Sequence, residues 1–366
     1  MGVDSPTICA LPFVHSCTRA DGAVTPCCRF SDGDYIEKMP PRAYLYSDKI
    51  STVRQQMLEG KRLTGCQKCY DEEAMGRKSM RQWANDDFID FVGHKKPIKS
   101  IEVSFNNLCN MACVMCSPQD SSKWNTYVDD LDYDGIFGIT KSSNKTNNLD
   151  FTKEEYESVT KLKILGGEPF INEKNIDFIE KFNLENLHFE THTNCSVIPN
   201  ERWLEVFKRL KYCDIRLSLD AKQDYASFSR YGVPWNQISA TLNWWIHFQS
   251  LQDAERFHLA IHSVVHIFTI FDMDRFIWFL KGRSVRKFIF HPVTTPAYLD
   301  IKILPKSIKE ELIPKIRDNY IKKYLENNID YVDEDNLNKF LIYAERLQKR
   351  EHFDFVDDII EKIKNA

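Results

Sequence analysis

The stretch Cys109-Asn-Met-Ala-Cys113-Val-Met-Cys116 carries three cysteines within eight residues, separated by three and then by two positions. It follows the apolar, alternating run Ile101-Glu-Val-Ser-Phe105, whose period of two predicts a β-strand. A short loop after a strand can fold back so that all three sulfurs face one point. Because thiolates bind iron strongly, this arrangement predicts a 4Fe–4S cluster held by Cys109, Cys113 and Cys116.

Only three ligands come from this loop, which leaves the fourth iron of a cubane open to another ligand. An open iron indicates a reactive centre rather than a simple electron carrier. A zinc site usually needs a fourth Cys or His nearby, and Ser117-Pro-Gln-Asp120 provides neither. The alternative of buried structural cysteines is disfavoured by the spacing of the three residues directly after a strand.

The composition is that of a globular protein. The chain has 366 residues, with 43% hydrophobic and 28% charged residues, enough for two domains or for one large domain with an extension. A net charge of −4 argues against tight, non-specific binding of nucleic acid, although it does not exclude a nucleic acid held by a local patch.

The eleven cysteines point to metal ligation rather than to disulfides. The N-terminus has no basic region followed by an apolar one, so no secretory signal is expected. No run of about eighteen apolar residues is found, so we expect no membrane span. Together these features predict a protein of the reducing cytoplasm.

The first 95 residues hold six of the cysteines. We expect short strands over 8–15 and 23–30, joined by a turn at Asp21-Gly22, which brings Cys9 and the Cys27/Cys28 doublet towards one end. A helix is predicted over 47–59.

The pair Cys66-Gln-Lys-Cys69 is a CxxC knuckle, which commonly binds metal through both sulfurs. Cys9, Cys27, Cys66 and Cys69 complete a four-thiolate site. Zinc and a second iron–sulfur cluster both satisfy this ligand count, and we favour the cluster because the chain already houses one. The choice between Cys27 and Cys28 stays open, and Cys17 is a spare or an alternative ligand.

The composition of residues 72–84 predicts a helix that connects the cysteine-rich segment to the part of the chain that follows. Their basic side chains fit a solvated helix face, with contact to a substrate or cluster as the alternative. These residues are Arg77, Lys78 and Arg81.

From residue 96 to 300, strand and helix patterns alternate, which predicts an α/β fold of parallel strands and crossover helices. The strands are expected near 100–105, 161–166, 187–193, 213–219, 257–265 and 286–292, and the helices near 118–129, 172–183, 200–210, 236–251 and 272–281. The alternation alone fits a six-unit partial barrel or a doubly wound sheet. Residues 301–366 predict two or three amphipathic helices.

Ligands of such folds bind at the carboxyl ends of the strands, and chemistry-bearing residues follow several of the predicted strands. In Gly166-Gly-Glu-Pro169, the glycines allow close backbone approach to a ligand and Glu168 offers a carboxylate. The others are Asn194, the pair Ser218 and Asp220, and Arg230, whose guanidinium can bind a carboxylate in a bidentate manner. Five histidines also lie on or near strands, and the sequence distinguishes none of them: His15, His192, His262, His266 and His291.

The CxxxCxxC run resembles the signature of the radical SAM superfamily, in which the open iron chelates the methionine part of S-adenosylmethionine (SAM). This resemblance implies a partial (β/α)6 TIM-like barrel and a set of SAM contacts. Gly166, Gly167 and Glu168 resemble the motif that holds the amino group. Asn194 lies where the family often has a Thr-Asn-Gly turn, here with Cys195 in place of the glycine. Ser218 and Asp220 resemble the ribose motif, Arg230 is expected at the carboxylate, and Met115 takes a position beside adenine that is often aromatic.

Cys9, twelve residues, Gly22, four residues and Cys27 resemble the opening of SPASM and twitch modules, which carry auxiliary 4Fe–4S clusters. Such modules usually follow the barrel, whereas these cysteines precede it, and a second run of four cysteines is absent. We therefore expect a Cys-rich, single-cluster, twitch-like module over 1–95, the barrel over 96–300 and C-terminal helices over 301–366.

The resemblance implies an enzyme that cleaves SAM reductively to methionine and a 5′-deoxyadenosyl radical, which takes a hydrogen atom from a substrate. An electron donor such as flavodoxin or ferredoxin is implied as a partner. Peptide or protein modification is the first expectation, and a small molecule or a nucleotide or RNA is the alternative. A zinc-binding or electron-transfer protein is the non-enzymatic alternative.

Overall fold

The structure, a computed structural model, describes residues 5–93, 98–143, 149, 151–283, 285 and 287–366. The chain forms two compact units that alternate along the sequence. The first comprises Met1–Asn107, Ser143–Thr191 and Pro199–Asp214, and the second comprises Leu108–Ser142, His192–Ile198 and Ile215–Ala366. The predicted boundary between residues 95 and 96 lies outside the described residues.

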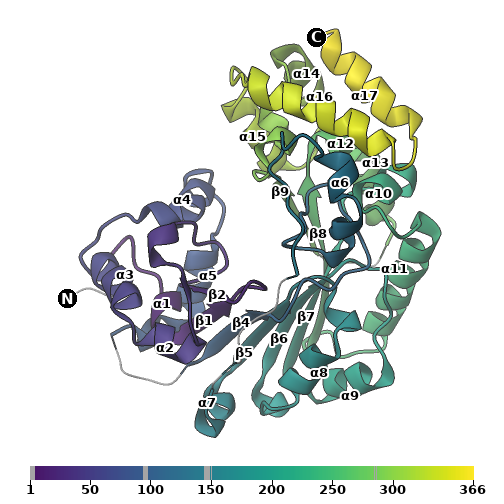
Figure 1. Cartoon of the computed structure of the whole chain (residues 1–366). Coiled ribbons are helices and arrows are strands. Elements are labelled where there is room, and N and C mark those ends of the chain that lie inside the picture. Colours follow the sequence, from purple (N-terminus) through teal and green to yellow (C-terminus); the bar gives the residue numbers. More distant parts are fainter. Residues whose placement is uncertain (1–4, 94–97, 144–148, 150, 284, 286) are drawn as a thin grey trace. The chain divides into compact units, whose positions relative to one another are not determined.

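The first unit contains a mixed sheet in the order β3-β2-β1-β4-β5-β6 (Figure 1). Its strands are β1 (His15–Thr18), β2 (Ala23–Thr25), β3 (Glu37–Lys38), β4 (Ser100–Ser104), β5 (Lys161–Leu165) and β6 (His188–Thr193). The hairpin predicted at Asp21-Gly22 is confirmed, because β1 and β2 pair antiparallel. Strands β1, β4, β5 and β6 are parallel neighbours, and Cys17 of β1 lies opposite Glu102 of β4.

The second unit contains the end of β7 and the two strands that follow it. They are β7 (Tyr212–Ser218), β8 (Phe257–Val265) and β9 (Lys287–Pro292), with β8 and β9 paired in parallel. All six strands expected after residue 96 are therefore confirmed. The helices that follow them are α8 (Glu173–Ile179), α9 (Glu201–Arg209), α11 (Trp235–Ser250) and α13 (Met273–Lys281).

The predicted α/β fold thus follows from local sequence signals. In α9, the Asn200 side chain caps the first turn by accepting from the Trp203 amide at 3.2 Å. Trp203 then lies against Phe170 and Phe189, with ring centroids 5.2 and 5.8 Å apart, which fastens α9 to β6 in the first unit.

Three predictions of local structure were wrong. Residues 8–15 do not form a strand, because Pro12 favours the first turn of a short helix, α1 (Leu11–Val14), and the strand begins only at His15. Residues 118–129 form the 3₁₀ segment η4 (Ser122–Thr126) and the short α6 (Val128–Leu131) rather than one helix, since Asp120 ties back to the Ser117 amide at 3.0 Å in a turn.

The C-terminal stretch forms four helices rather than two or three. They are α14 (Lys306–Leu312), α15 (Asn319–Asn327), α16 (Glu334–Gln348) and α17 (Asp354–Lys364). The short α14 escapes a periodicity argument because it spans only seven residues.

The cysteine-rich N-terminal segment adds its own helices to the first unit. They are α2 (Pro41–Leu45), α3 (Asp48–Leu58), α4 (Gln67–Ala74) and α5 (Met80–Phe88). The predicted helix over 47–59 is confirmed as α3, with Ser47 accepting from the Ile50 amide. The predicted connector over 72–84 is divided, because Gly76 adopts a φ of +78° between α4 and α5.

The remaining short helices are α7 (Lys153–Ser158), α10 (Gln223–Ser229) and α12 (Ile267–Ile270). Within the described part of the chain, no helix is both long and apolar enough to span a membrane.

Gly65 precedes the CxxC pair and leaves room for the buried ring of Phe30. A Cβ at Gly65 would lie 2.5 Å from Phe30 Cζ, and that ring is packed inside the N-terminal core. We therefore expect Gly65→Ala to lower the free energy of unfolding by about 1–3 kcal/mol through overpacking.

The matched control is Gly33→Ala, because a Cβ at Gly33 meets nothing within 4 Å. We expect its effect to stay within about 0.5 kcal/mol. Urea denaturation followed by circular dichroism measures both, and equal midpoints for the two variants would contradict this packing argument.

Candidate functional site

The three-cysteine loop lies in the second unit and brings two of its three side chains together. Cys113 is buried, whereas Cys109 and Cys116 are half-buried. The Cys116 amide donates to the Cys113 carbonyl at 3.0 Å, which turns the loop back on itself. A hydrogen bond between the two side chains lowers the pKa of Cys113 from its ordinary value. Two of the predicted ligands therefore lie side by side.

The backbone of the loop is paired with the segment that follows α10. The Ala112 amide donates to the Tyr231 carbonyl at 2.7 Å, and the Val114 amide donates to the Ser229 carbonyl at 2.8 Å. Gly232 continues this contact, since its φ is +118° and a Cβ there would lie 2.9 Å from the Asn110 carbonyl oxygen. The loop conformation therefore requires glycine at position 232.

Residues from the C-terminal helices also hold the loop. Tyr343 of α16 donates its hydroxyl to the Val114 carbonyl at 2.8 Å, and Arg350 donates to the Ala112 carbonyl at 3.4 Å. The Arg350 guanidinium lies 5.3 Å from the Trp124 ring centroid and 4.4 Å from that of Tyr231. Sequence reasoning missed these roles, because it predicted only amphipathic helices for the C-terminal stretch.

Two of the predicted cofactor residues direct N–H groups at the sulfurs. The side-chain nitrogen Nδ2 of Asn194 donates to Cys109 Sγ at 3.8 Å and to Asn110 Oδ1 at 2.8 Å. Arg230 Nη1 donates to Cys113 Sγ at 3.9 Å. Donors and a cation facing sulfur stabilise the thiolate, which is the form that ligates metal.

Asp220 and Arg230 are paired with each other. Arg230 contacts the carboxylate through Nη2 at 3.0 Å and through Nε at 2.9 Å, and Asp220 also accepts from the Val264 amide at 2.8 Å. A buried ion pair of this kind, with one hydrogen bond from Nη2, fixes the guanidinium beside Cys113. The expected contacts of both residues with SAM stay predictions.

The other predicted SAM contacts of the second unit lie on the loop and at a strand end. Met115 is half-buried within the cysteine loop, and Ser218 is half-buried as the last residue of β7. Cys195, where the resemblance leads us to expect a glycine, has a φ of +61°. This left-handed conformation is the one that glycine adopts most readily, so the turn keeps its shape despite the substitution.

The Gly-Gly-Glu segment lies in the first unit, directly after β5. Gly166 and Gly167 have φ angles of +95° and +53°, as expected for a turn that glycine favours. A Cβ at Gly166 would lie 2.6 Å from the Asn106 carbonyl oxygen, so this backbone packs closely on the end of β4. Glu168 is fully buried and accepts from the Phe170 amide at 3.3 Å.

In the first unit, the four thiols predicted as a second site line one pocket. Besides Cys9, Cys27, Cys66 and Cys69, this pocket is lined by Leu11, Arg29, Gly65, Lys68, Met80 and Arg81. Burial raises the pKa of Cys9 and of Cys66 to about 12, so a metal that binds here must displace their protons. Four thiols and three cationic side chains around one space fit a negatively charged thiolate cluster.

The structure separates the two cysteines of the doublet. Cys27 lines the four-thiol pocket, whereas Cys28 Sγ contacts Met80 Sδ at 3.8 Å, and burial together with the nearby Glu102 carboxylate raises the pKa of the Cys28 thiol. The two cysteines follow the end of β2 and lie in a turn, which the Phe30 amide closes by donating to the Cys27 carbonyl at 3.2 Å.

Arg81 corrects the interpretation of the connector as a solvated face. Its guanidinium is buried, lines the four-thiol pocket, donates to the Ile8 carbonyl at 2.8 Å and pairs with Glu73 at 2.7 Å. Lys78, by contrast, is exposed and pairs with Asp86.

Three histidines that the sequence did not distinguish form a row in the second unit. The ring centroids of His192 and His262 are 4.9 Å apart, and those of His262 and His291 are 5.2 Å apart. They come from the end of β6, which belongs to the second unit, and from β8 and β9. No sequence signal indicates this row, because the three residues are separated by 70 and 29 positions.

Comparison with known proteins finds similarity only among solved structures. No family model matches the chain, and no curated protein matches it significantly. One matching structure is native anSMEcpe with bound AdoMet and Cp18Cys peptide, at 15% identity and a TM-score of 0.39, which covers 64% of this chain and 62% of that one. Streptococcus suis SuiB bound to S-adenosylmethionine matches at 12% identity and a TM-score of 0.36, covering 86% and 68%. SuiB bound to precursor peptide SuiA matches at 13% and 0.37, covering 86% and 69%.

The close contact between Gly232 and the cysteine loop predicts a specific defect. We expect Gly232→Ala to displace the loop, because its Cβ would overlap the Asn110 carbonyl. After anaerobic reconstitution with iron and sulfide, the variant should hold roughly half of the iron of the wild type, the remainder belonging to the four-thiol pocket.

Gly135→Ala is the matched control, since Gly135 also has a positive φ, of +73°, but open space at the Cβ position. It should retain the full iron content, measured as iron per chain. A Gly232→Ala protein with wild-type iron would show that the contact does not hold the loop.

Proposed function

We propose that the chain is a radical SAM enzyme with an auxiliary iron–sulfur cluster. The observation that carries this proposal is the three-cysteine loop, fixed by Tyr231 and Ser229 and faced by the N–H groups of Asn194 and Arg230. Three thiolates with side-chain donors aimed at them suit a cluster that has one iron free for a cofactor. The CxxxCxxC spacing gives the same indication.

When bound, the cluster and SAM supply the one-electron cleavage that yields methionine and a 5′-deoxyadenosyl radical, which takes a hydrogen atom from the substrate. The protein binds and orients the cofactors and the substrate, and it excludes water from them. Cys109, Cys113 and Cys116 hold the cluster, and Glu168, with Gly166 and Gly167, receives the SAM amino group. Asn194, Ser218, Asp220, Arg230 and Met115 complete the cofactor contacts.

The second cluster in this proposal is held by Cys9, Cys27, Cys66 and Cys69. Because all four ligands come from the protein, no iron is left open, and electron transfer is its role. Arg29, Lys68 and Arg81 offset the negative charge of the thiolates around the pocket. An external donor such as flavodoxin or ferredoxin supplies electrons, and eleven cysteines without a disulfide among the described residues suit a reducing cytoplasm.

The substrate is a peptide or protein in this proposal. This choice rests on the resemblance of the N-terminal cysteine pattern to SPASM and twitch modules. The 49 basic and 53 acidic residues give no excess of positive charge for a nucleic acid.

The cofactor chemistry is tested by anaerobic incubation of the reconstituted protein with SAM and a strong reductant. The wild type should release 5′-deoxyadenosine, measured by chromatography, and Cys113→Ala should release none, because one cluster ligand is lost. Cys213→Ala is the control, since Cys213 is a buried strand cysteine outside both sets of ligands. Absence of product from a fully loaded wild type would refute the proposal.

The auxiliary cluster is tested by iron content. The wild type should hold about eight irons per chain, as two cubanes require. Cys27→Ala and Cys66→Ala should lose about half of this iron, whereas Cys28→Ala should keep it, because Cys28 faces Glu102. Equal iron in the Cys27→Ala and Cys28→Ala proteins would contradict the assignment of ligands.

A further inference from the structure

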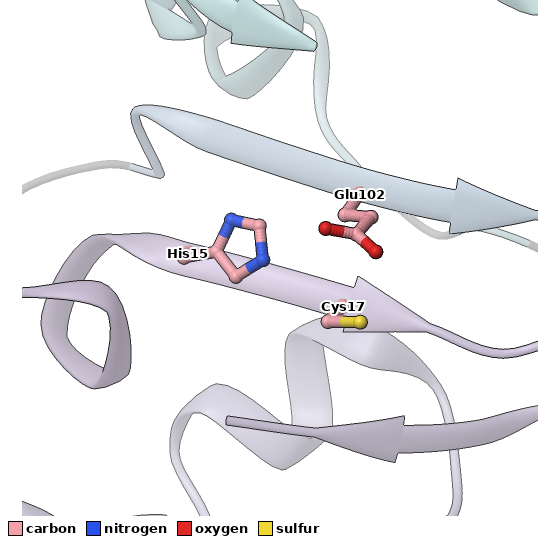
Figure 2. A group of neighbouring side chains, drawn as sticks. All are labelled: His15, Cys17 and Glu102. Carbon is pink, nitrogen blue, oxygen red and sulfur yellow. The ribbon is translucent and has the colours of Figure 1, made fainter. Parts of the chain in front are cut away.

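A second cluster of ligand-type side chains lies on the sheet of the first unit. His15 and Cys17 are two positions apart on β1, so both side chains project from the same face of the strand. Glu102 lies opposite Cys17 on the parallel neighbour β4. Figure 2 shows the imidazole, the thiol and the carboxylate turned towards one another. One ligand atom from each of the three residues lies within 4.8 Å of the others.

These side chains are removed from solvent, and one of them lacks a partner. His15, Cys17 and Glu102 are 4%, 2% and 3% exposed. His15 Nδ1 pairs with Ser100 Oγ at 2.8 Å, whereas the buried Nε2 has no hydrogen-bond partner among the described residues. A metal-ligating histidine is typically held in this manner, with one nitrogen oriented by a protein group and the other left for the metal.

We propose that His15, Cys17 and Glu102 form a zinc site that is distinct from the four-thiol pocket. The donor set combines an imidazole nitrogen, a thiolate sulfur and a carboxylate oxygen, which suits Zn²⁺ and not the oxygen-seeking Mg²⁺ or Ca²⁺. None of the three residues lines the four-thiol pocket. A histidine that only packs in the core is the plain alternative, but it would leave Nε2 buried without a partner, at a cost in free energy.

A fourth ligand and a balancing charge are both available. Cys28 lies near Cys17 and Glu102, outside the group of three, and is the fourth ligand in this proposal once its side chain turns to the metal. Two thiolates and a carboxylate around Zn²⁺ leave one negative charge. Lys163 Nζ, 3.7 Å from Glu102 Oε2 and 3.3 Å from Glu190 Oε1, offsets this charge.

The position of the site assigns it a structural role. It joins β1 to β4, and thus links the strand of the cysteine-rich segment to the first strand of the parallel series. Its closed set of protein ligands leaves no position for a substrate, as in structural zinc sites.

The test uses the full-length protein, reconstituted with iron and sulfide so that thiolate cluster sites are filled, then supplied with Zn²⁺ and freed of loose metal. We expect roughly one zinc per chain, with zinc-edge X-ray absorption showing both Zn–S distances of about 2.3 Å and Zn–N/O distances of about 2.0 Å. This edge is not obscured by iron. His15→Gln and Cys17→Ser should lower the zinc content at least about tenfold while the iron stays unchanged.

Cys213→Ser is the matched control, a buried strand cysteine of the same unit, and should keep its zinc. A wild type that binds no zinc would overturn the proposal, as would full zinc in Cys17→Ser. A zinc spectrum with sulfur ligands alone would also overturn it, because the four-thiol pocket would then hold the metal. If a variant fails to fold, the content and spectrum of the wild type decide by themselves.

Discussion

The candidate cofactor site depends on two backbone hydrogen bonds, from the Ala112 and Val114 amides to the Tyr231 and Ser229 carbonyls. A loop that carries three thiolates has no regular secondary structure of its own, so its shape must come from the segments around it. Through these bonds the loop runs alongside residues 229–231. Gly232 allows the loop backbone to come this close because it has no side chain. Since Arg230 lies within the same segment, one contact fixes both the loop and the cation beside Cys113.

The sequence predicts well those parts of the chain that have a regular apolar pattern or a turn residue at their ends. Alternation of apolar residues identifies the six parallel strands, and turn residues such as Gly22 and Gly166 mark where their chains bend. Contacts between distant residues leave no such trace. Val114 and Tyr343 are 229 positions apart, and nothing in the local pattern of either indicates that they meet. The strand expected over 8–15 failed for a local reason, because Pro12 starts a helical turn more readily than it continues a strand.

The doublet Cys27-Cys28 shows that two adjacent thiols can belong to different surroundings. Sequence spacing could not choose between two adjacent thiols, since either satisfies the same ligand count. In the folded chain the two side chains diverge, Cys27 towards the four-thiol pocket and Cys28 towards Glu102. A pattern of cysteines therefore does not by itself tell which of two adjacent sulfurs lines which site.

The cysteine-rich N-terminal segment contributes a strand to the same sheet as the parallel strands. Its strand β1 pairs in parallel with β4 over four residues, so the sheet is continuous from the hairpin to β6. The Cα register places Cys17 opposite Glu102, and a slip of one residue would turn both side chains to the other face. The proposed zinc site would stabilise this register, because zinc can bind only when the imidazole, thiol and carboxylate share one face. In this way a metal held between β1 and β4 stabilises the alignment that also carries Cys27 to the four-thiol pocket.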